Sequence, residues 1–330
     1  MSSRYSRSPA GAVDKVFIEL NGARQGMFIT QSHRSRPVLL YLHGGMPDFF
    51  LNETYPTGLE QFFTMVWWEQ RGSGMSYQPR APQDLITVDQ LMDDTLALSD
   101  HLRRRFHQER IYLMGHSGGT FLGIQAAARA PEMFHAYIAV AQISHQLESE
   151  VLAYRFMLEE CRKRGYHRLA RKLQRCPVTK EQGTPASYLR VRDVAMHRLG
   201  IGTMHTMTSV LSGIFLPSLR CRHYTVGERV RLWAAKARSG ASVVWDAMLA
   251  TDLRRQVTEV GVPVYFLHGV HDYTCSYALA RSYFDGITAP TKGFYSFENS
   301  AHSPIFEEPQ RTQRIVRDDI LQGATTLADA

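Results

Sequence analysis

The sequence predicts an α/β fold in which a mostly parallel, doubly wound sheet is interrupted by an inserted block of helices. Two observations support this prediction. Short, nearly continuous apolar runs alternate with helical patterns, and strands buried on both faces of a parallel sheet have such runs. From residue 144 to residue 244 the strand pattern is absent and long helical patterns take its place.

The strands are predicted in chain order from these runs and from turn residues. The segment 13–30 alternates loosely and contains Asn21-Gly22, which is a signal for a type I′ hairpin. Buried strands are then predicted at 38–42, 62–68, 111–114 and 137–141, and after the helical block at 262–267 and 293–297.

The helices between these strands have recognisable ends. Thr87 to Gln90 reads as a capping box, and Arg103 to Arg105 suit the C-terminus of the helix that follows. An alanine-rich helix is predicted over 121–130, because Pro131 ends the pattern. Further helices are predicted at 147–174, 188–199, 276–284 and 310–321.

The chain has 330 residues, of which 44% are hydrophobic and 21% are charged, and this composition excludes wholesale disorder. We expect a flexible tail at residues 1–12, a core domain at 13–143 and 245–330, and a helical cap at 144–244. No apolar run reaches the roughly 20 residues that span a bilayer, and the N-terminus has no apolar signal region. We therefore expect a cytoplasmic protein without a membrane span.

The four cysteines are widely spaced, so free thiols are expected and a metal site is not.

A strand, a Gly-x-Ser-x-Gly motif and a helix follow one another at 111–130. In Gly115-His116-Ser117-Gly118-Gly119, small residues on either side of the serine permit a sharp turn. Such a turn exposes the hydroxyl at a helix N-terminus, where backbone amides stabilise an anion. The motif predicts Ser117 as a nucleophile, and a purely structural turn is the alternative.

A nucleophilic serine needs a base, which itself needs an orienting acid. In this strand–turn–helix context the chain order is serine, acid, histidine. His302 lies in a loop after the last predicted strand, and Asp272 follows the strand before it. The end of the strand at 137–141 offers no carboxylate, which favours Asp272. We therefore predict a triad of Ser117, Asp272 and His302, and a structural role for His271.

The carbonyl under attack develops negative charge, so two amide donors are needed near it. One is predicted to be the amide of Gly118. The other is predicted in the loop after the strand at 38–42, where Gly45 is favoured over Gly44. A glycine turn without such a role is the alternative.

Together, five motifs resemble the α/β-hydrolase superfamily and are most similar to its proline iminopeptidase branch. They are His43-Gly44-Gly45, Glu69 to Ser76, Gly115 to Thr120, Gly269 to Asp272 and the His302 loop. The resemblance implies the α/β-hydrolase fold, a triad of Ser117, Asp272 and His302, a helical cap over the site, and no cofactor or metal. It also implies structural roles for Arg71 and Gly72.

Three departures from this branch concern the site. Met46-Pro47-Asp48 follows the paired glycines, where Pro-Gly is usual, and Glu69 replaces an aspartate. Gly118 replaces a tryptophan after the nucleophile, which should leave a roomier acyl pocket. Further substrate contacts are assigned to Gly44, Met46, His116, Phe156 and Glu159.

Charge is unevenly distributed along the chain. Between Val151 and Gly240 there are 18 Lys and Arg but only five Asp and Glu. The rest of the chain has 20 Lys and Arg and 26 Asp and Glu. Peptidases of the branch resemble one another in holding the substrate amine with cap carboxylates. A cap this basic should instead repel a cationic amine and attract an anionic or neutral ligand. A solvated arginine-rich face is the alternative.

The sequence therefore predicts a serine hydrolase that forms an acyl-enzyme with an ester, thioester, lactone or amide of a small molecule. One alternative is acyl transfer, cyclisation or release from a carrier protein, because these reactions resolve the same intermediate. Another is a ligand-binding protein without catalysis. The basic residues lack an interleaved aromatic platform, so no nucleic-acid partner is predicted.

Overall fold

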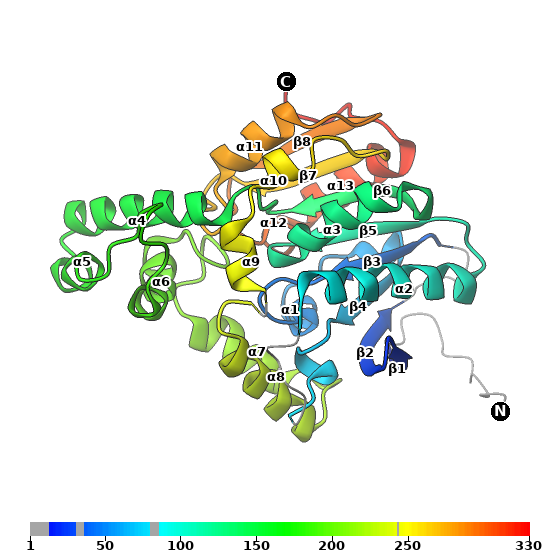
Figure 1. Cartoon of the computed structure of the whole chain (residues 1–330), viewed down its shortest axis with the longest axis horizontal. Coiled ribbons are helices and arrows are strands. Elements are labelled where there is room, and N and C mark those ends of the chain that lie inside the picture. Colours follow the sequence, from blue (N-terminus) through cyan, green and yellow to red (C-terminus); the bar gives the residue numbers. More distant parts are fainter. Residues whose placement is uncertain (1–12, 31–35, 80–85, 243) are drawn as a thin grey trace.

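The computed structural model describes residues 13–30, 36–79, 86–242 and 244–330, and the predicted tail at 1–12 lies outside them. Eight strands form one sheet (Figure 1). In spatial order they are β1 (Val13–Leu20), β2 (Ala23–Thr30), β4 (Thr64–Glu69), β3 (Val38–Leu42), β5 (Ile111–His116), β6 (Phe134–Val140), β7 (Val264–Gly269) and β8 (Lys292–Phe297). The pairs β1/β2 and β2/β4 are antiparallel, and all other pairs are parallel. The predicted α/β fold with a mostly parallel sheet is therefore confirmed.

The antiparallel edge begins with the predicted hairpin. β1 and β2 pair along their whole length, from Val13 with Thr30 to Leu20 with Ala23. Asn21 and Gly22 make the turn with φ of 46° and 74°. Positive φ at both central positions is what a type I′ turn requires, and its twist matches that of the strands.

The central parallel strands are buried on both faces. In β3, Val38, Leu40 and Leu42 belong to one hydrophobic core, whereas Leu39 and Tyr41 belong to another. Because side chains alternate across a strand, both faces must be apolar, which explains the continuous apolar run in the sequence.

Helices cover both faces of the sheet. The first core includes residues of α2 (Val88–Phe106), α3 (Gly118–Arg129) and α11 (Tyr277–Gly286). The second includes residues of α1 (Phe49–Thr54), α12 (Pro304–Glu307) and α13 (Pro309–Asp318). α2 begins as predicted, with the Thr87 hydroxyl accepting the N–H of Gln90 at 3.1 Å.

Between β6 and β7 the described residues form helices and add no strand to the sheet. These helices are α4 (Gln146–Lys163), α5 (His167–Gln174), α6 (Ala186–Leu199), α7 (Leu216–Arg220), α8 (Val226–Ser239), α9 (Trp245–Ala250) and α10 (Leu253–Gln256). Figure 1 shows α4 to α6 extending to the left of the sheet, with α7 and α8 below. We call α4 to α8 the helical segment.

The helical segment has a core of its own and differs from prediction in one respect. Met157, Leu173 and Tyr188 are among the buried residues that join α4, α5 and α6. The single helix predicted over 147–174 is wrong, because the chain turns between α4 and α5. Gly165 has a φ of 71° there, a conformation that glycine adopts without the steric cost of a Cβ.

The four cysteines, which were predicted to be free thiols, form no disulfide, and all four are buried. Within the described ranges, no helix is long and apolar enough to cross a membrane.

Candidate active site

The turn between β5 and α3 holds Ser117 at φ 55° and ψ −124°. This backbone conformation is costly for a residue with a side chain, so the surrounding packing must maintain it. A Cβ atom built on Gly115 would lie 2.6 Å from the carbonyl oxygen of Gly119. One built on Gly119 would lie 2.0 Å from the carbonyl oxygen of Leu42. The two glycines allow α3 to pack directly against the strands, as the motif predicts.

His302 and Asp272 form a buried hydrogen-bonded pair at the ends of neighbouring parallel strands, β8 and β7. Nδ1 of His302 donates to Oδ2 of Asp272 at 2.9 Å. The backbone N–H groups of Thr274 and Cys275 donate to Oδ1 at 2.8 and 3.0 Å. With its proton on Nδ1, the imidazole has its free lone pair on Nε2.

A second histidine also approaches Asp272. Nε2 of His268 lies 3.3 Å from Oδ2 of Asp272 and donates to the carbonyl of Cys275 at 2.8 Å. Burial alone would raise the pKa of Asp272, but the charge and hydrogen bonds of His302 and His268 hold it well below its ordinary value. Burial lowers the pKa of His302, and Asp272 only partly opposes this shift. A carboxylate beside a neutral imidazole is the state in which Nε2 accepts a proton.

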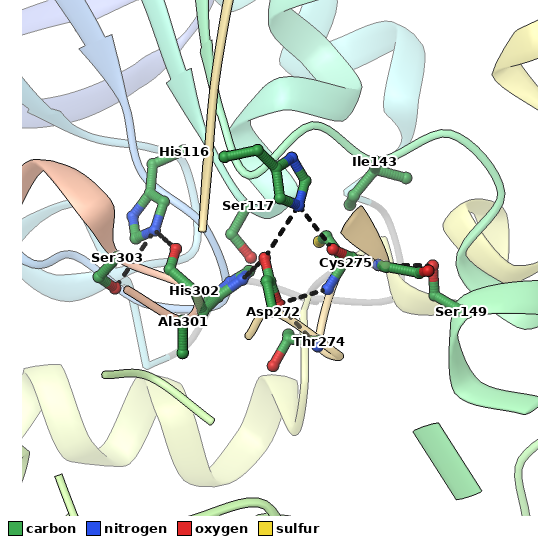
Figure 2. Close-up of polar contacts among 12 residues, drawn as sticks. His116, Ser117, Ile143, Ser149, Asp272, Thr274, Cys275, Ala301, His302 and Ser303 are labelled. Carbon is green, nitrogen blue, oxygen red and sulfur yellow. Dashed lines mark hydrogen bonds and ion pairs between the residues drawn. The ribbon is translucent and has the colours of Figure 1, made fainter. Parts of the chain in front are cut away.

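The structure brings the three predicted triad residues together. Figure 2 shows the Ser117 hydroxyl pointing toward the His302–Asp272 pair. Ser117 and His302 also line one cavity of about 480 Å³. The residues meet because β5, β7 and β8 are parallel, so the loops that follow them leave the sheet at the same edge.

The loop after β3 packs against the nucleophile turn. A Cβ built on Gly44 would lie 2.7 Å from Cβ of Ser117. His43 braces this loop, because its Nδ1 donates to the Gly44 carbonyl at 2.8 Å and its Nε2 accepts the N–H of Gln70 at 3.1 Å. Burial lowers the pKa of His43 to about 4, so near neutral pH the ring keeps the neutral form that makes both bonds.

Gly45 and Gly118 both line the cavity. In the described part of the chain, neither backbone N–H donates a hydrogen bond to another residue. Both are therefore available to an oxygen atom of a ligand. A Cβ built on Gly118 would lie in ordinary van der Waals contact with the Gly44 backbone at 3.5 Å and with Sδ of Met248 at 3.7 Å.

His116 connects the nucleophile turn to the His302 loop, a link that the sequence did not indicate. Its Nδ1 lies 3.0 Å from Oδ2 of Asp48, which also accepts the Tyr41 hydroxyl at 2.7 Å. Its Nε2 lies 3.0 Å from the main-chain oxygen of His302 (Figure 2). His116 therefore holds the His302 loop in place in addition to lining the cavity. Residues 48 and 116 share no local pattern, so only the fold reveals their contact.

Three of the five residues predicted to contact the substrate lie at the cavity. Gly44, Met46 and His116 line the cavity, and the helices contribute its other wall. That wall includes Gln146 of α4, Met196 of α6, Trp233 of α8 and Met248 of α9.

The predictions for Phe156 and Glu159 are wrong. Neither residue lines the cavity, because only the first residue of α4, Gln146, reaches it. The Phe156 ring stacks on Tyr273, with their centroids 4.0 Å apart. Glu159 is exposed and pairs with Lys163 at 2.8 Å.

Glu69, the second departure from the branch, joins the sheet to the helical segment. Its carboxyl group accepts the N–H of Met75 and the hydroxyl of Tyr224, which precedes α8. Burial raises the pKa of Glu69 to about 7. Glutamate is longer than the aspartate that is usual at this position in the branch. The Glu69 carboxyl group thus contacts the helical segment as well as its own loop.

The described residues contain no cluster of three or more His, Cys, Asp or Glu side chains suited to a metal ion.

Comparisons with known proteins agree with this architecture. A family described as serine aminopeptidase, S33, matches residues 59–194. The probable aminopeptidase YbaC of Bacillus subtilis (strain 168) is 27% identical over 296 residues, which cover 88% of this chain and 91% of that protein. The crystal structure of VinJ has a TM-score of 0.64 at 18% identity, covering 96% of this chain and 100% of that chain. The structure of proline iminopeptidase from Mycobacterium smegmatis has a TM-score of 0.62 at 16% identity, and the match covers 94% of this chain and 98% of that chain. The predicted α/β-hydrolase fold and the resemblance to the proline iminopeptidase branch are confirmed.

The close packing at the nucleophile turn predicts a difference between two neighbouring glycines. Gly119→Ala should lower the melting temperature by several degrees, because overpacking of this kind costs about 1–3 kcal/mol. Gly118→Ala is the matched control, since its Cβ would approach no atom closer than 3.5 Å. Thermal unfolding of both variants tests this, and equal melting temperatures would contradict it.

The pairing of His302 with Asp272 predicts a titration that NMR can follow. The His302 ring should titrate with a pKa below 6.5, because burial disfavours its charged form. Asp272→Asn removes the charge that opposes this shift, so the pKa of His302 should fall further. An unchanged or higher pKa in Asp272→Asn would show that the two groups are not coupled.

Proposed function

We propose that this chain, which has the α/β-hydrolase fold, is a serine hydrolase that cleaves an ester, thioester, lactone or amide of a small molecule through an acyl-enzyme. One observation carries the proposal. Ser117, in a left-handed turn at a helix N-terminus, lines one cavity with His302, whose imidazole is hydrogen-bonded to the buried Asp272.

In the proposed reaction, the Ser117 oxygen attacks the substrate carbonyl while Nε2 of His302 takes the hydroxyl proton. Asp272 keeps the ring in the required tautomer and stabilises the imidazolium that forms. The amides of Gly45 and Gly118 hold the oxyanion. His302 then gives the proton to the leaving group, and a water molecule releases the acyl group by the reverse sequence. None of these steps needs a cofactor.

The position of the helices supports their predicted role as a cap. Residues of α4, α6 and α8 line the cavity opposite the nucleophile turn. In this proposal the helical segment encloses the acyl group and limits access of water to the intermediate.

The charges around the cavity favour a substrate without a free ammonium. Glu150 of α4 is buried, but Arg192 binds both of its oxygens at 2.6 and 2.7 Å. Tyr188 also donates to this carboxylate, at 2.9 Å. Because Glu150 is already neutralised by a guanidinium, it offers little attraction for an amine.

An aminopeptidase is the second candidate. The matching family and the relative from Bacillus subtilis are described as aminopeptidases. Asp193 lines the cavity and is exposed, with Arg192 at 3.1 Å, so it is the acidic group best placed to meet an amine.

The nucleophile assignment is tested with a fluorophosphonate probe, which labels activated serines covalently. The probe should label the wild type but not Ser117→Ala, because this variant lacks the attacking oxygen. Ser303→Ala is a matched control, since Ser303 also lines the cavity. Labelling that persists in Ser117→Ala would overturn the assignment.

The substrate class is tested with two p-nitrophenyl esters that differ only in charge, of alanine and of N-acetylalanine. We expect kcat/KM to be about 10-fold or more higher for the acetylated ester, because the basic cavity repels an ammonium. Comparable rates, or a faster reaction of the free amine that is lost in Asp193→Asn, would favour the aminopeptidase.

A further inference from the structure

We propose that Lys236 is a receptor for a carboxylate on the substrate, so that the proposed hydrolase acts on acyl compounds that carry a second, negatively charged group. This inference rests on the proposed function and specifies its substrate class. The observations that support it are the position of the ammonium, its lack of an acidic partner, and the charges that surround it.

Lys236 lies in the last turn of α8, and its half-buried side chain lines the cavity that contains Ser117. Nζ donates to the main-chain oxygens of Gly45 and Ala241 at 3.3 and 3.4 Å. The first of these belongs to the loop proposed to hold the oxyanion. The ammonium is therefore close to the place where the reacting carbonyl would lie.

No carboxylate in the described part of the chain forms an ion pair with Lys236. An ammonium has three protons to donate, and two long bonds to neutral carbonyls compensate poorly for its partial removal from water. Burial accordingly lowers the pKa of Lys236, Asp193 opposes the shift and Arg192 adds to it. Removing the Lys236 ammonium from water without an acidic partner lowers the stability of the folded protein, and an anionic ligand would offset this loss.

The other charged groups that line the cavity are paired to different extents. Asp48 contacts His116 and Tyr41 through Oδ2, but its buried Oδ1 has no hydrogen-bond partner among the described residues. Arg192 is bound by Glu150. Asp193 shares this guanidinium, so Arg192 faces two carboxylates. Arg190 also lines the cavity, is exposed, and has no ion-pair partner among the described residues. The lysine and arginine side chains that line the cavity without an ion-pair partner among the described residues are therefore Lys236 and Arg190.

The surface next to the cavity is also positively charged. A second, open hollow of about 1070 Å³ lies between α5, α6 and the segment 208–211. It shares the lining residues Asp193, His197 and Val210 with the active-site cavity, so the two hollows are neighbours. The basic residues along it are Arg168, Arg171, Lys172 and Arg198. This positive field would draw an anionic acyl compound toward Lys236.

A carboxylate is the anion that this geometry fits best. The site offers a single ammonium and one rim guanidinium, not a cluster of donors such as a phosphate dianion requires. The neighbouring wall contributes apolar contacts from Trp233 and Met248. A short aliphatic chain that ends in a carboxylate would satisfy both features.

The experiment compares p-nitrophenyl hemiesters of dicarboxylic acids, from succinate to suberate, with the uncharged esters of matching length. We expect the wild type to prefer the hemiester at one or more lengths. In Lys236→Met the ratio of kcat/KM for that hemiester to its neutral match should fall by about 10- to 100-fold, the usual worth of a charge-assisted hydrogen bond. Lys236→Arg should retain most of the preference. Arg231→Met removes one charge from an exposed site on the same helix and should leave the ratio unchanged.

A binding measurement separates this proposal from the proposed hydrolase activity. Calorimetry of Ser117→Ala with monomethyl glutarate should show binding that is lost when Lys236→Met is added. If the wild type labels with fluorophosphonate but shows no hemiester preference, or if Lys236→Met does not change that preference, the proposed carboxylate receptor is overturned and the hydrolase stands. If the protein is not labelled but monomethyl glutarate binding depends on Lys236, the receptor stands and the hydrolase does not.

Discussion

The contact between α3 and the end of β3 is the constraint on which the rest of the site depends. Gly119 lies so close to the carbonyl oxygen of Leu42 that no Cβ fits between them. Because the helix begins this near the strand, the connection has a single residue in which to reverse direction, and Ser117 adopts a positive φ. The same packing sets the N-terminus of α3 beside Gly44, so Ser117 and the loop proposed to supply an amide donor are positioned by one contact.

Buried histidines connect the loops that surround the cavity through hydrogen bonds. His43 ties the loop after β3 to the loop after β4, and His116 ties the nucleophile turn to the main chain of His302. His268 contacts both Asp272 and the carbonyl of Cys275. In His43 and His116 the two ring nitrogens contact different segments, so a buried imidazole can join loops that have no secondary structure of their own. His268 makes both of its contacts through Nε2. This bracing makes the edge of the sheet rigid enough to orient an acid–base pair.

The two sides of the cavity differ in how their charges are compensated. On the sheet side, both oxygens of Asp272 accept hydrogen bonds, and Oδ2 of Asp48 contacts His116 and Tyr41. On the helical side, Glu150 is occupied by Arg192, whereas Lys236 has only carbonyl oxygens. The chemistry proposed for the sheet side is common to many acyl compounds. Selection among them would therefore come from the helical side, where the uncompensated charge lies.

The sequence by itself determined the strands, the hairpin at Asn21-Gly22 and the positions of Ser117, Asp272 and His302, because local signals carry this information: apolar runs, turn residues and chain order. It did not place the break at Gly165, since a glycine inside a helical pattern is compatible with a continuous helix. Tertiary structure alone decided the Asp48–His116 contact, the outward position of Glu159 and the inward position of Lys236. The physical reason is that the rotation of a helix against the sheet depends on how distant side chains pack, and no periodicity along the chain records that packing.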